Sequence, residues 1–190
     1  MKETETLPPG KLIAGRYRVQ ERLGEGGMGS VYAVEHVHTG QELALKVLNA
    51  KMVQDQIALE RFRRESRAPA RIQSDHVVQV TDADVAPELG GAPFLIMERL
   101  RGQSFDQLLA GAVMSPAATL LYLGQVARAL DKAHGLGIIH RDIKPENIFL
   151  TKREDGTPLV KLLDFGIAKL TEGTDMSSKT ATGAIFGTPL

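Results

Sequence analysis

His140-Arg141-Asp142-Ile143-Lys144-Pro145-Glu146-Asn147 is a polar stretch in the second half of the chain, and Asp164-Phe165-Gly166 follows it after two apolar segments. Phosphoryl transfer needs a carboxylate that orients the attacking hydroxyl and accepts its proton. It also needs oxygen ligands for magnesium ions that bridge the phosphates. The two motifs contain candidates for each role: Asp142 as base, Lys144 as a group that neutralises charge on the transferred phosphate, and Asn147 and Asp164 as magnesium ligands.

A glycine-rich stretch, Gly24-Glu25-Gly26-Gly27-Met28-Gly29, lies far upstream between two strand-like segments. Its glycines let the backbone turn sharply and approach a phosphate closely. Residues 30–34 continue as a strand and not as a helix. The helix-dipole mechanism of dinucleotide-binding folds therefore does not apply, and the stretch would act as a flap over phosphates. An ordinary glycine-rich hairpin is the alternative interpretation of this segment taken alone.

Lys46 follows the apolar residues Leu43-Ala44-Leu45 in a predicted strand under that flap. A lysine at this position is often only a solvated strand end. Glu65 lies nineteen residues further along, in an arginine-rich helical segment. An ion pair between the two side chains would hold Lys46 against the α- and β-phosphates of a nucleotide.

Composition excludes several other classes of protein. The chain has 190 residues, 23 Lys plus Arg, 23 Asp plus Glu, and 43% apolar residues, which is typical of a globular protein without a global electrostatic field. We therefore expect no nucleic-acid binding. The absence of cysteine excludes disulfides, thiolate metal sites and a cysteine nucleophile. No apolar stretch approaches the ~18 residues that span a bilayer, so we expect no membrane contact within these residues.

The first half of the chain predicts strands separated by turns, with one helix. The expected elements are strands at residues 17–23, 30–36 and 42–48 in an antiparallel meander, a surface helix at 56–73, and strands at 77–82 and 94–98. Pro69 should end or kink the helix. Because Pro69 lies four residues after Glu65, it affects how firmly a Lys46–Glu65 pair can be held.

The second half predicts a long helix that Ser115 caps and Pro116 begins. Its expected apolar face comprises Leu120, Leu123, Val126, Ala127 and Leu130. Two short strands, at residues 148–151 and 160–163, should follow it. Residues 171–183 are polar and without periodicity, which predicts a mobile loop.

With these motifs in this order, the sequence resembles the bacterial serine/threonine protein kinases of the eukaryotic-like (Hanks) type from about residue 17 to residue 190. The resemblance implies an α+β, two-lobed fold with a small lobe of five antiparallel strands plus one helix and a mainly helical large lobe. It implies an N-terminal extension at residues 1–16 and a kinase domain at 17–190. Residues 17–99 would form the small lobe and the start of the hinge, and residues 100–190 a partial large lobe.

The resemblance also implies ATP and Mg²⁺ as cofactors and Ser or Thr of protein substrates as acceptors. Lys144, two residues after the base, matches serine/threonine and not tyrosine kinases. Val31 and Ala44 would cover the adenine from one side and Phe149 from the other, with Met97 as gatekeeper and the backbone from Glu98 to Leu100 binding the adenine edge. The implied nucleotide-binding set is Leu23, Gly24, Glu25, Gly26, Gly27, Met28, Gly29, Val31, Ala44, Lys46, Glu65, Met97, Glu98, Leu100 and Phe149.

Regulation by phosphorylation follows from Arg141, because an arginine beside the base is typical of kinases whose activation loop is phosphorylated. Thr180 and Thr182 lie just before Gly187-Thr188-Pro189 and are the expected autophosphorylation sites. Thr188 resembles the loop threonine that contacts the base and the lysine, so we do not expect it to be the regulatory site.

Similar kinases continue beyond the Gly-Thr-Pro segment, whereas this sequence ends at Leu190. We therefore expect an incomplete kinase domain, weak or absent activity of these residues alone, and exposed apolar surface on the helix around Leu120 to Leu130. The expected location is the cytoplasm, with a possible membrane tether beyond Leu190.

Two other functions compete with the kinase interpretation. A non-catalytic nucleotide-binding or partner-binding module would keep the motifs without the reaction. A small-molecule phosphotransferase of related fold is the other, and Lys144 and the Gly187-Thr188-Pro189 segment argue against it. The basic cluster of Arg61, Arg63, Arg64, Arg67 and Arg71 is interpreted as a solvated helix face, because Glu60 and Glu65 are interleaved with it.

Overall fold

The computed structural model describes residues 6–27, 29–49, 60, 62, 66, 70–111 and 113–165. The chain divides into two compact units. The first comprises Met1–Arg71 and Val78–Arg101, and the second comprises Ile72–Val77 and Gly102–Leu190. None of the helices in the described ranges is long and apolar enough to cross a membrane.

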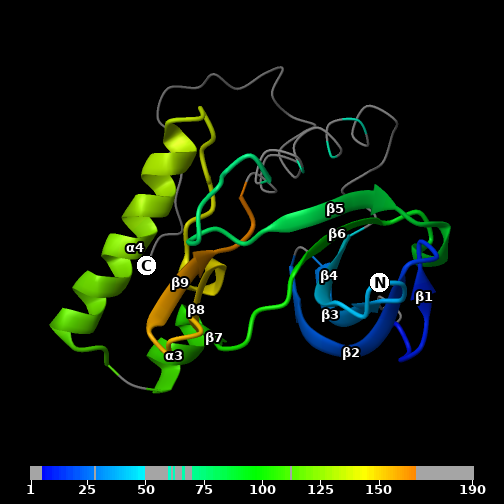
Figure 1. Ribbon diagram of the computed structural model, residues 1–190, viewed down its shortest axis with the longest axis horizontal. Coiled ribbons are helices and arrows are strands. Elements are labelled where there is room, and N and C mark those ends of the chain that lie inside the picture. Colours follow the sequence, from blue (N-terminus) through cyan, green and yellow to red (C-terminus); the bar gives the residue numbers. More distant parts are fainter. Residues whose placement is uncertain are drawn as a thin grey trace. The chain divides into compact units, whose positions relative to one another are not determined.

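A curled antiparallel sheet of six strands forms the first unit, in the order β1-β2-β3-β4-β6-β5 (Figure 1). The strands are β1 (Leu12–Ile13), β2 (Tyr17–Gly26), β3 (Gly29–His36), β4 (Glu42–Leu48), β5 (Val80–Val85) and β6 (Pro93–Glu98). The five predicted strands are thus present, and the two-residue β1 adds a sixth at the edge beside β2.

The fourth predicted strand, at residues 77–82, was placed three residues too early. β5 spans Val80–Val85, because its pairing with β6 runs from Val80↔Met97 to Val85↔Pro93. Val77 instead forms an isolated parallel bridge with Leu162 in the second unit. A short 3-10 helix, η2 (Pro87–Leu89), then leads through Gly90 at φ 63° into β6.

Alternation along the strands directs one set of side chains into a single hydrophobic cluster. Tyr32 pairs with Leu45, and Leu45 pairs with Ile96, so these three side chains point to the same side. All three are buried in one hydrophobic cluster with Val47 and Phe94. The residues between them along each strand point to the opposite face.

Within its described residues, the second unit combines a three-stranded sheet, in the order β7-β8-β9, with two α-helices and a short 3-10 helix (Figure 1). The elements in chain order are β7 (Gln103–Ser104), α3 (Phe105–Gly111), α4 (Pro116–His134), η3 (Pro145–Asn147), β8 (Ile148–Lys152) and β9 (Pro158–Leu162). Ser115 caps α4 as predicted, accepting a hydrogen bond from the Ala118 backbone N–H at 3.2 Å. β8 and β9 were predicted from the sequence, whereas α3 and β7 were not.

The predicted apolar face of α4 was partly wrong. Val126 is buried, but Leu120 and Leu123 are exposed, Leu120 by 74%. The helix instead packs on β9 through Gln125 and two alanines, Ala129 and Ala133, whose small side chains allow close approach. The exposed leucines form the apolar surface that was expected on this helix.

Several expectations lie outside the described residues. The predicted helix at residues 56–73 is described only at single positions, where Ser66 N–H donates to the Phe62 carbonyl as in a helix. Pro69 and the predicted loop at residues 171–183 are not among the described residues.

Candidate active site

The loop between α4 and β8 brings three of the predicted catalytic and metal-binding residues together. Lys144 Nζ lies 3.1 Å from Asp142 Oδ2. Asn147 Nδ2 donates to the same carboxylate oxygen at 3.0 Å and to the Asp142 backbone carbonyl at 2.8 Å. Asn147 is 5% exposed, so its amide is fixed from within the unit. The loop therefore holds the Asp142 carboxylate by one oxygen, and the other oxygen takes no part in these contacts.

His140 ties this loop to the segment that carries Asp164. Its Nε2 lies 2.7 Å from the Leu163 carbonyl, and the Asp142 backbone N–H donates to its Nδ1 at 3.3 Å. These partners assign the neutral tautomer with the proton on Nε2. Burial lowers the pKa of His140, in keeping with a neutral ring at 1% exposure. This is the environment of a packed structural residue.

The two predicted metal ligands flank the hairpin that β8 and β9 form: Asn147 directly precedes β8, and Asp164 lies two residues after β9. Ile148 pairs with Leu162, and beyond that pair the Leu163 N–H donates to the Asn147 carbonyl at 2.9 Å. Asp164 follows directly, with a left-handed φ of 59° that is uncommon for a residue other than glycine. Such conformations cluster at functional sites.

These residues fit a magnesium ion. Asn147 uses its amide nitrogen for both contacts with Asp142, so neither contact engages its oxygen. No group of three or more His, Cys, Asp or Glu side chains that could hold a metal occurs within the described residues. Mg²⁺ suits this arrangement, because it usually takes only one or two protein oxygens and completes its shell with phosphate and water.

The predicted nucleotide residues of the first unit share one face of its sheet. Val31 on β3 pairs with Lys46 on β4, and Ala44 on β4 pairs with Met97 on β6. Ala44 and Lys46 are two apart on β4, so all four side chains lie on the face opposite the apolar cluster. Lys46 is 7% exposed, and it is therefore not a solvated strand end.

The glycines of the β2–β3 turn differ in what the fold requires of them. Gly29 has a φ of 143°, and a Cβ there would lie 1.9 Å from the Val47 carbonyl oxygen, so the fold itself demands glycine. At Gly24, Gly26 and Gly27 a Cβ would meet nothing within 4 Å, and none has a positive φ. Close approach of a ligand would explain glycine at these three positions.

The remaining predicted residues are less constrained. Leu23 is exposed, Glu25 forms a 2.8 Å ion pair with Arg22, and the Glu98 carboxylate accepts the Gln79 N–H at 2.8 Å. Leu100 follows the end of β6, and Phe149 lies on β8 in the second unit, opposite Lys161. Predicted site residues that lie outside the described part of the chain are Met28, Glu65, Thr180 and Thr182.

Arg99, which was not predicted from the sequence as a site residue, forms ion pairs with residues on two other strands of the first unit. A charged residue between Glu98 and Leu100, beside a predicted adenine-binding backbone, was the available signal.

A glycine-rich turn between antiparallel strands, a buried lysine on the next strand, and a loop with a carboxylate held by lysine and asparagine together define a protein-kinase-type phosphotransferase domain. Residues 17–188 match the family described as protein kinase domain. The chain belongs to this family, among the bacterial serine/threonine protein kinases of the eukaryotic-like type.

The relatives include two proteins of Myxococcus xanthus. Serine/threonine-protein kinase Pkn1 is 43% identical over 175 residues, covering 92% of this chain and 24% of that protein. Serine/threonine-protein kinase pkn3 is 40% identical over 182 residues, covering 95% of this chain and 33% of that protein. The chain thus spans a third or less of the length of these relatives. Their names do not favour the alternative of a non-catalytic module.

Solved structures agree with the two-lobed kinase fold. The Mycobacterium tuberculosis PknI kinase domain superposes with a TM-score of 0.74 at 36% identity. The match covers 85% of this chain and 64% of that one.

Proposed function

We propose that this domain binds Mg·ATP and transfers the γ-phosphoryl group to Ser or Thr hydroxyls of protein substrates. The observation that carries the proposal is the fixed Asp142 carboxylate, which Lys144 contacts at 3.1 Å and Asn147 at 3.0 Å through the same oxygen. A base held by one oxygen presents the other to a substrate hydroxyl in a defined direction.

In the proposed step, Asp142 orients the hydroxyl and accepts its proton. A bond forms between the hydroxyl oxygen and the γ-phosphorus, the bond from that phosphorus to the β–γ bridging oxygen breaks, and ADP leaves. Lys144, next to the carboxylate, offsets negative charge on the transferred group.

Magnesium, when bound, neutralises and orients the phosphates. Asn147 and Asp164 are the residues that would hold it. His140 ties the loop that carries Asp142 to the segment that carries Asp164, because its ring bonds to the backbone at Asp142 and at Leu163. A buried, neutral histidine does this without adding charge beside the metal.

For the nucleotide, we propose that Val31, Ala44 and Met97 contact the adenine and that Lys46 binds the α- and β-phosphates. Their shared sheet face supports this assignment. The glycines at positions 24, 26 and 27 would admit the phosphates closely, with Leu23, Glu25, Met28 and Gly29 completing the turn. We further propose that Phe149, the backbone from Glu98 to Leu100, and a Lys46–Glu65 ion pair complete the set.

We propose autophosphorylation of Thr180 or Thr182 as the regulatory event. We also propose that the domain acts in the cytoplasm, since ATP is the phosphate donor. Arg141, exposed and at a left-handed φ of 69°, is the expected partner of the added phosphate.

Intact mass of the 190-residue chain after incubation with ATP and Mg²⁺ tests the proposal. We expect slow addition of phosphate to the wild type, in keeping with the weak activity predicted for these residues alone, and none to Asp142→Asn. Peptide mapping should then find phosphate on Thr180 or Thr182, and phosphate only on Ser177 or Ser178 would contradict that assignment. Equal phosphate on both proteins would overturn the proposed reaction. A wild type that binds Mg·ATP and gains no phosphate would favour the alternative of a non-catalytic nucleotide-binding module for these residues.

A further inference from the structure

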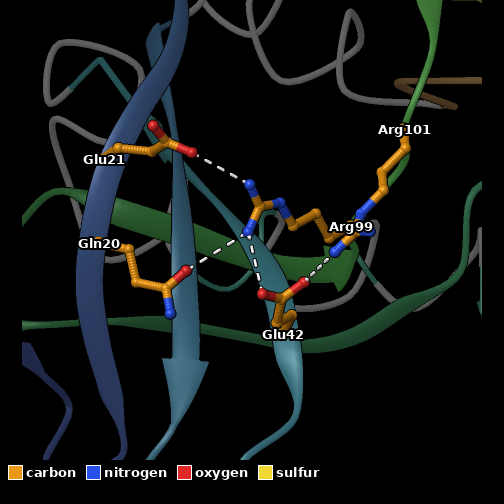
Figure 2. Close-up of polar contacts among 5 residues, drawn as sticks. All are labelled: Gln20, Glu21, Glu42, Arg99 and Arg101. Carbon is orange, nitrogen blue, oxygen red and sulfur yellow. Dashed lines mark hydrogen bonds and ion pairs between the residues drawn. The ribbon is translucent and has the colours of Figure 1, made fainter.

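Arg99 follows the last residue of β6, and its side chain crosses to two other strands of the first unit (Figure 2). Its Nη2 lies 3.1 Å from Glu21 Oε1 on β2. Its Nη1 lies 3.5 Å from Glu42 Oε1 at the start of β4 and 3.4 Å from Gln20 Oε1 on β2. One guanidinium group therefore joins β2, β4 and the segment after β6.

This guanidinium is well covered, because the Arg99 side chain is 19% exposed, although Glu21 and Glu42 are 64% and 46% exposed. Glu42 also accepts Arg101 Nη2 at 2.8 Å through its other oxygen (Figure 2). Each carboxylate oxygen of Glu42 thus has its own arginine. The planar guanidinium donates in several fixed directions, which suits one side chain that must reach three acceptors.

The contacts on β2 lie where its backbone ladder is interrupted. Pairing with β3 passes from Val19↔Val34 to Glu21↔Ala33, so Gln20 has no partner residue. A second interruption falls between Arg22 and Gly24. Bulges bend a strand and weaken local pairing. The stretch that leads into the glycine-rich turn is therefore fixed less by its ladder than the rest of the sheet, and Arg99 contacts two of its residues.

The three joined segments are those to which the proposed function assigns nucleotide binding. Glu21 lies two residues before Leu23 on the glycine-rich strand, Glu42 lies two residues before Ala44, and Arg99 lies between Glu98 and Leu100. We infer that Arg99 is a positioning residue of the nucleotide site, which fixes the base of the glycine-rich turn relative to the adenine-binding segment at residues 98–100. This inference rests on the proposed nucleotide site.

The expected effect is on nucleotide affinity more than on folding. Ion pairs between exposed carboxylates and arginine contribute little to stability. The position of the bulged strand β2, by contrast, determines whether the adenine and the phosphates of one nucleotide can be bound at the same time. ATP, which spans the adenine and phosphate parts, should therefore depend on Arg99 more than adenosine does.

Calorimetric titration of the chain with Mg·ATP and with adenosine tests this inference. For Arg99→Gln we expect an increase of about threefold to tenfold in the Kd for Mg·ATP, a smaller increase for adenosine, and little change in Tm. Arg99→Lys keeps the charge but loses the forked geometry of the guanidinium group. Its Kd for Mg·ATP should therefore lie between those of the wild type and Arg99→Gln. Arg18→Gln is the matched control, because it removes an exposed ion pair to Glu35 between β2 and β3, and it should bind as the wild type does.

A double-mutant cycle with Glu21→Gln separates the role of the bridge from that of Arg99 alone. If Arg99 acts through Glu21, the double variant should bind Mg·ATP no more weakly than Arg99→Gln. Wild-type affinity in Arg99→Gln, or equal losses for ATP and adenosine, would overturn the inference and leave the proposed function intact. A wild-type chain that folds and binds no Mg·ATP would overturn the proposed function and the inference with it.

Discussion

The two regions that carry the candidate site differ in how far apart along the chain their residues lie. In the second unit, Asp142, Lys144 and Asn147 contact one another within six residues, and His140 extends the cluster to Leu163. In the first unit, Val31, Ala44, Lys46 and Met97 come to one face only because β3, β4 and β6 pair in register. The catalytic loop is thus local, whereas the nucleotide face depends on long-range strand pairing.

This difference also separates what a substitution should change. Substitutions in the loop should change the reaction, and substitutions in the sheet should change nucleotide binding and folding.

Lys144→Ala should lower the rate of phosphoryl transfer by about 10²-fold to 10³-fold, because it removes the charge beside the Asp142 carboxylate. The Kd for Mg·ATP should stay within about twofold of the wild type. Single-turnover transfer and nucleotide titration on the same preparation measure the two quantities. Lys152→Ala, at the exposed end of β8, is the control and should leave both unchanged. An equal loss of affinity and rate in Lys144→Ala would contradict the separation between effects on the reaction and effects on nucleotide binding.

Gly29→Ala should mainly destabilise the fold, whereas Gly26→Ala should mainly weaken the binding of Mg·ATP. Alanine at position 29 places a Cβ against the Val47 carbonyl oxygen and should lower the free energy of unfolding by about 2–4 kcal/mol. Alanine at position 26 meets open space, so unfolding should change by less than about 0.5 kcal/mol while Mg·ATP binds more weakly. Chemical denaturation and nucleotide titration check the pair. A destabilised Gly26→Ala, or a Gly29→Ala that is as stable as the wild type, would contradict the register described here.

Gln125→Met should lower the free energy of unfolding by about 1–3 kcal/mol. The Gln125 side chain accepts the Val160 N–H at 2.8 Å and donates to the Pro158 carbonyl at 3.2 Å, so its loss leaves buried backbone groups on β9 without these partners. Gln103→Met, at an exposed position on β7, provides the comparison and should be close to neutral. Equal stability of the two variants would show that α4 does not hold β9 through this amide.

Acidification should destabilise the chain modestly through His76. Burial lowers the pKa of this histidine, whose Nδ1 lies 3.0 Å from the Val160 carbonyl. The folded state therefore binds the proton less readily than the unfolded state, so stability is retained above pH ~6.5 and falls as the pH drops below it. His140 adds to the same trend, since its pKa is also lowered by burial. Denaturation curves at several pH values should show a shallower dependence in His76→Gln than in the wild type.

The local motifs made the loop predictable from sequence. Asp142, Lys144 and Asn147 are close in the chain, so any fold that keeps the loop compact brings them together, and the capping residue Ser115 likewise marks the start of α4. The strands from residue 17 to residue 48 were also predictable, because each is a short segment rich in β-branched and apolar residues and turns separate the segments.

Long-range effects explain what sequence reasoning missed. The start of β5 is set by its pairing with β6, and no local signal separates Val77 from Val80. The buried face of α4 contains a glutamine and two alanines, because β9 needs a hydrogen-bond partner and close contact there, whereas Leu120 and Leu123 are exposed and Leu130 is partly buried. Arg99 was missed for the same reason, since its partners lie 57 to 79 residues away in sequence and only the folded sheet brings them together.

Asp142→Asn provides the most direct test of the account, with phosphoryl transfer and the Kd for Mg·ATP measured on one preparation. The account predicts that transfer disappears, since an amide cannot accept the hydroxyl proton, while the nucleotide binds as tightly as to the wild type. Transfer at the wild-type rate, or loss of transfer that is explained by loss of nucleotide binding, would contradict it.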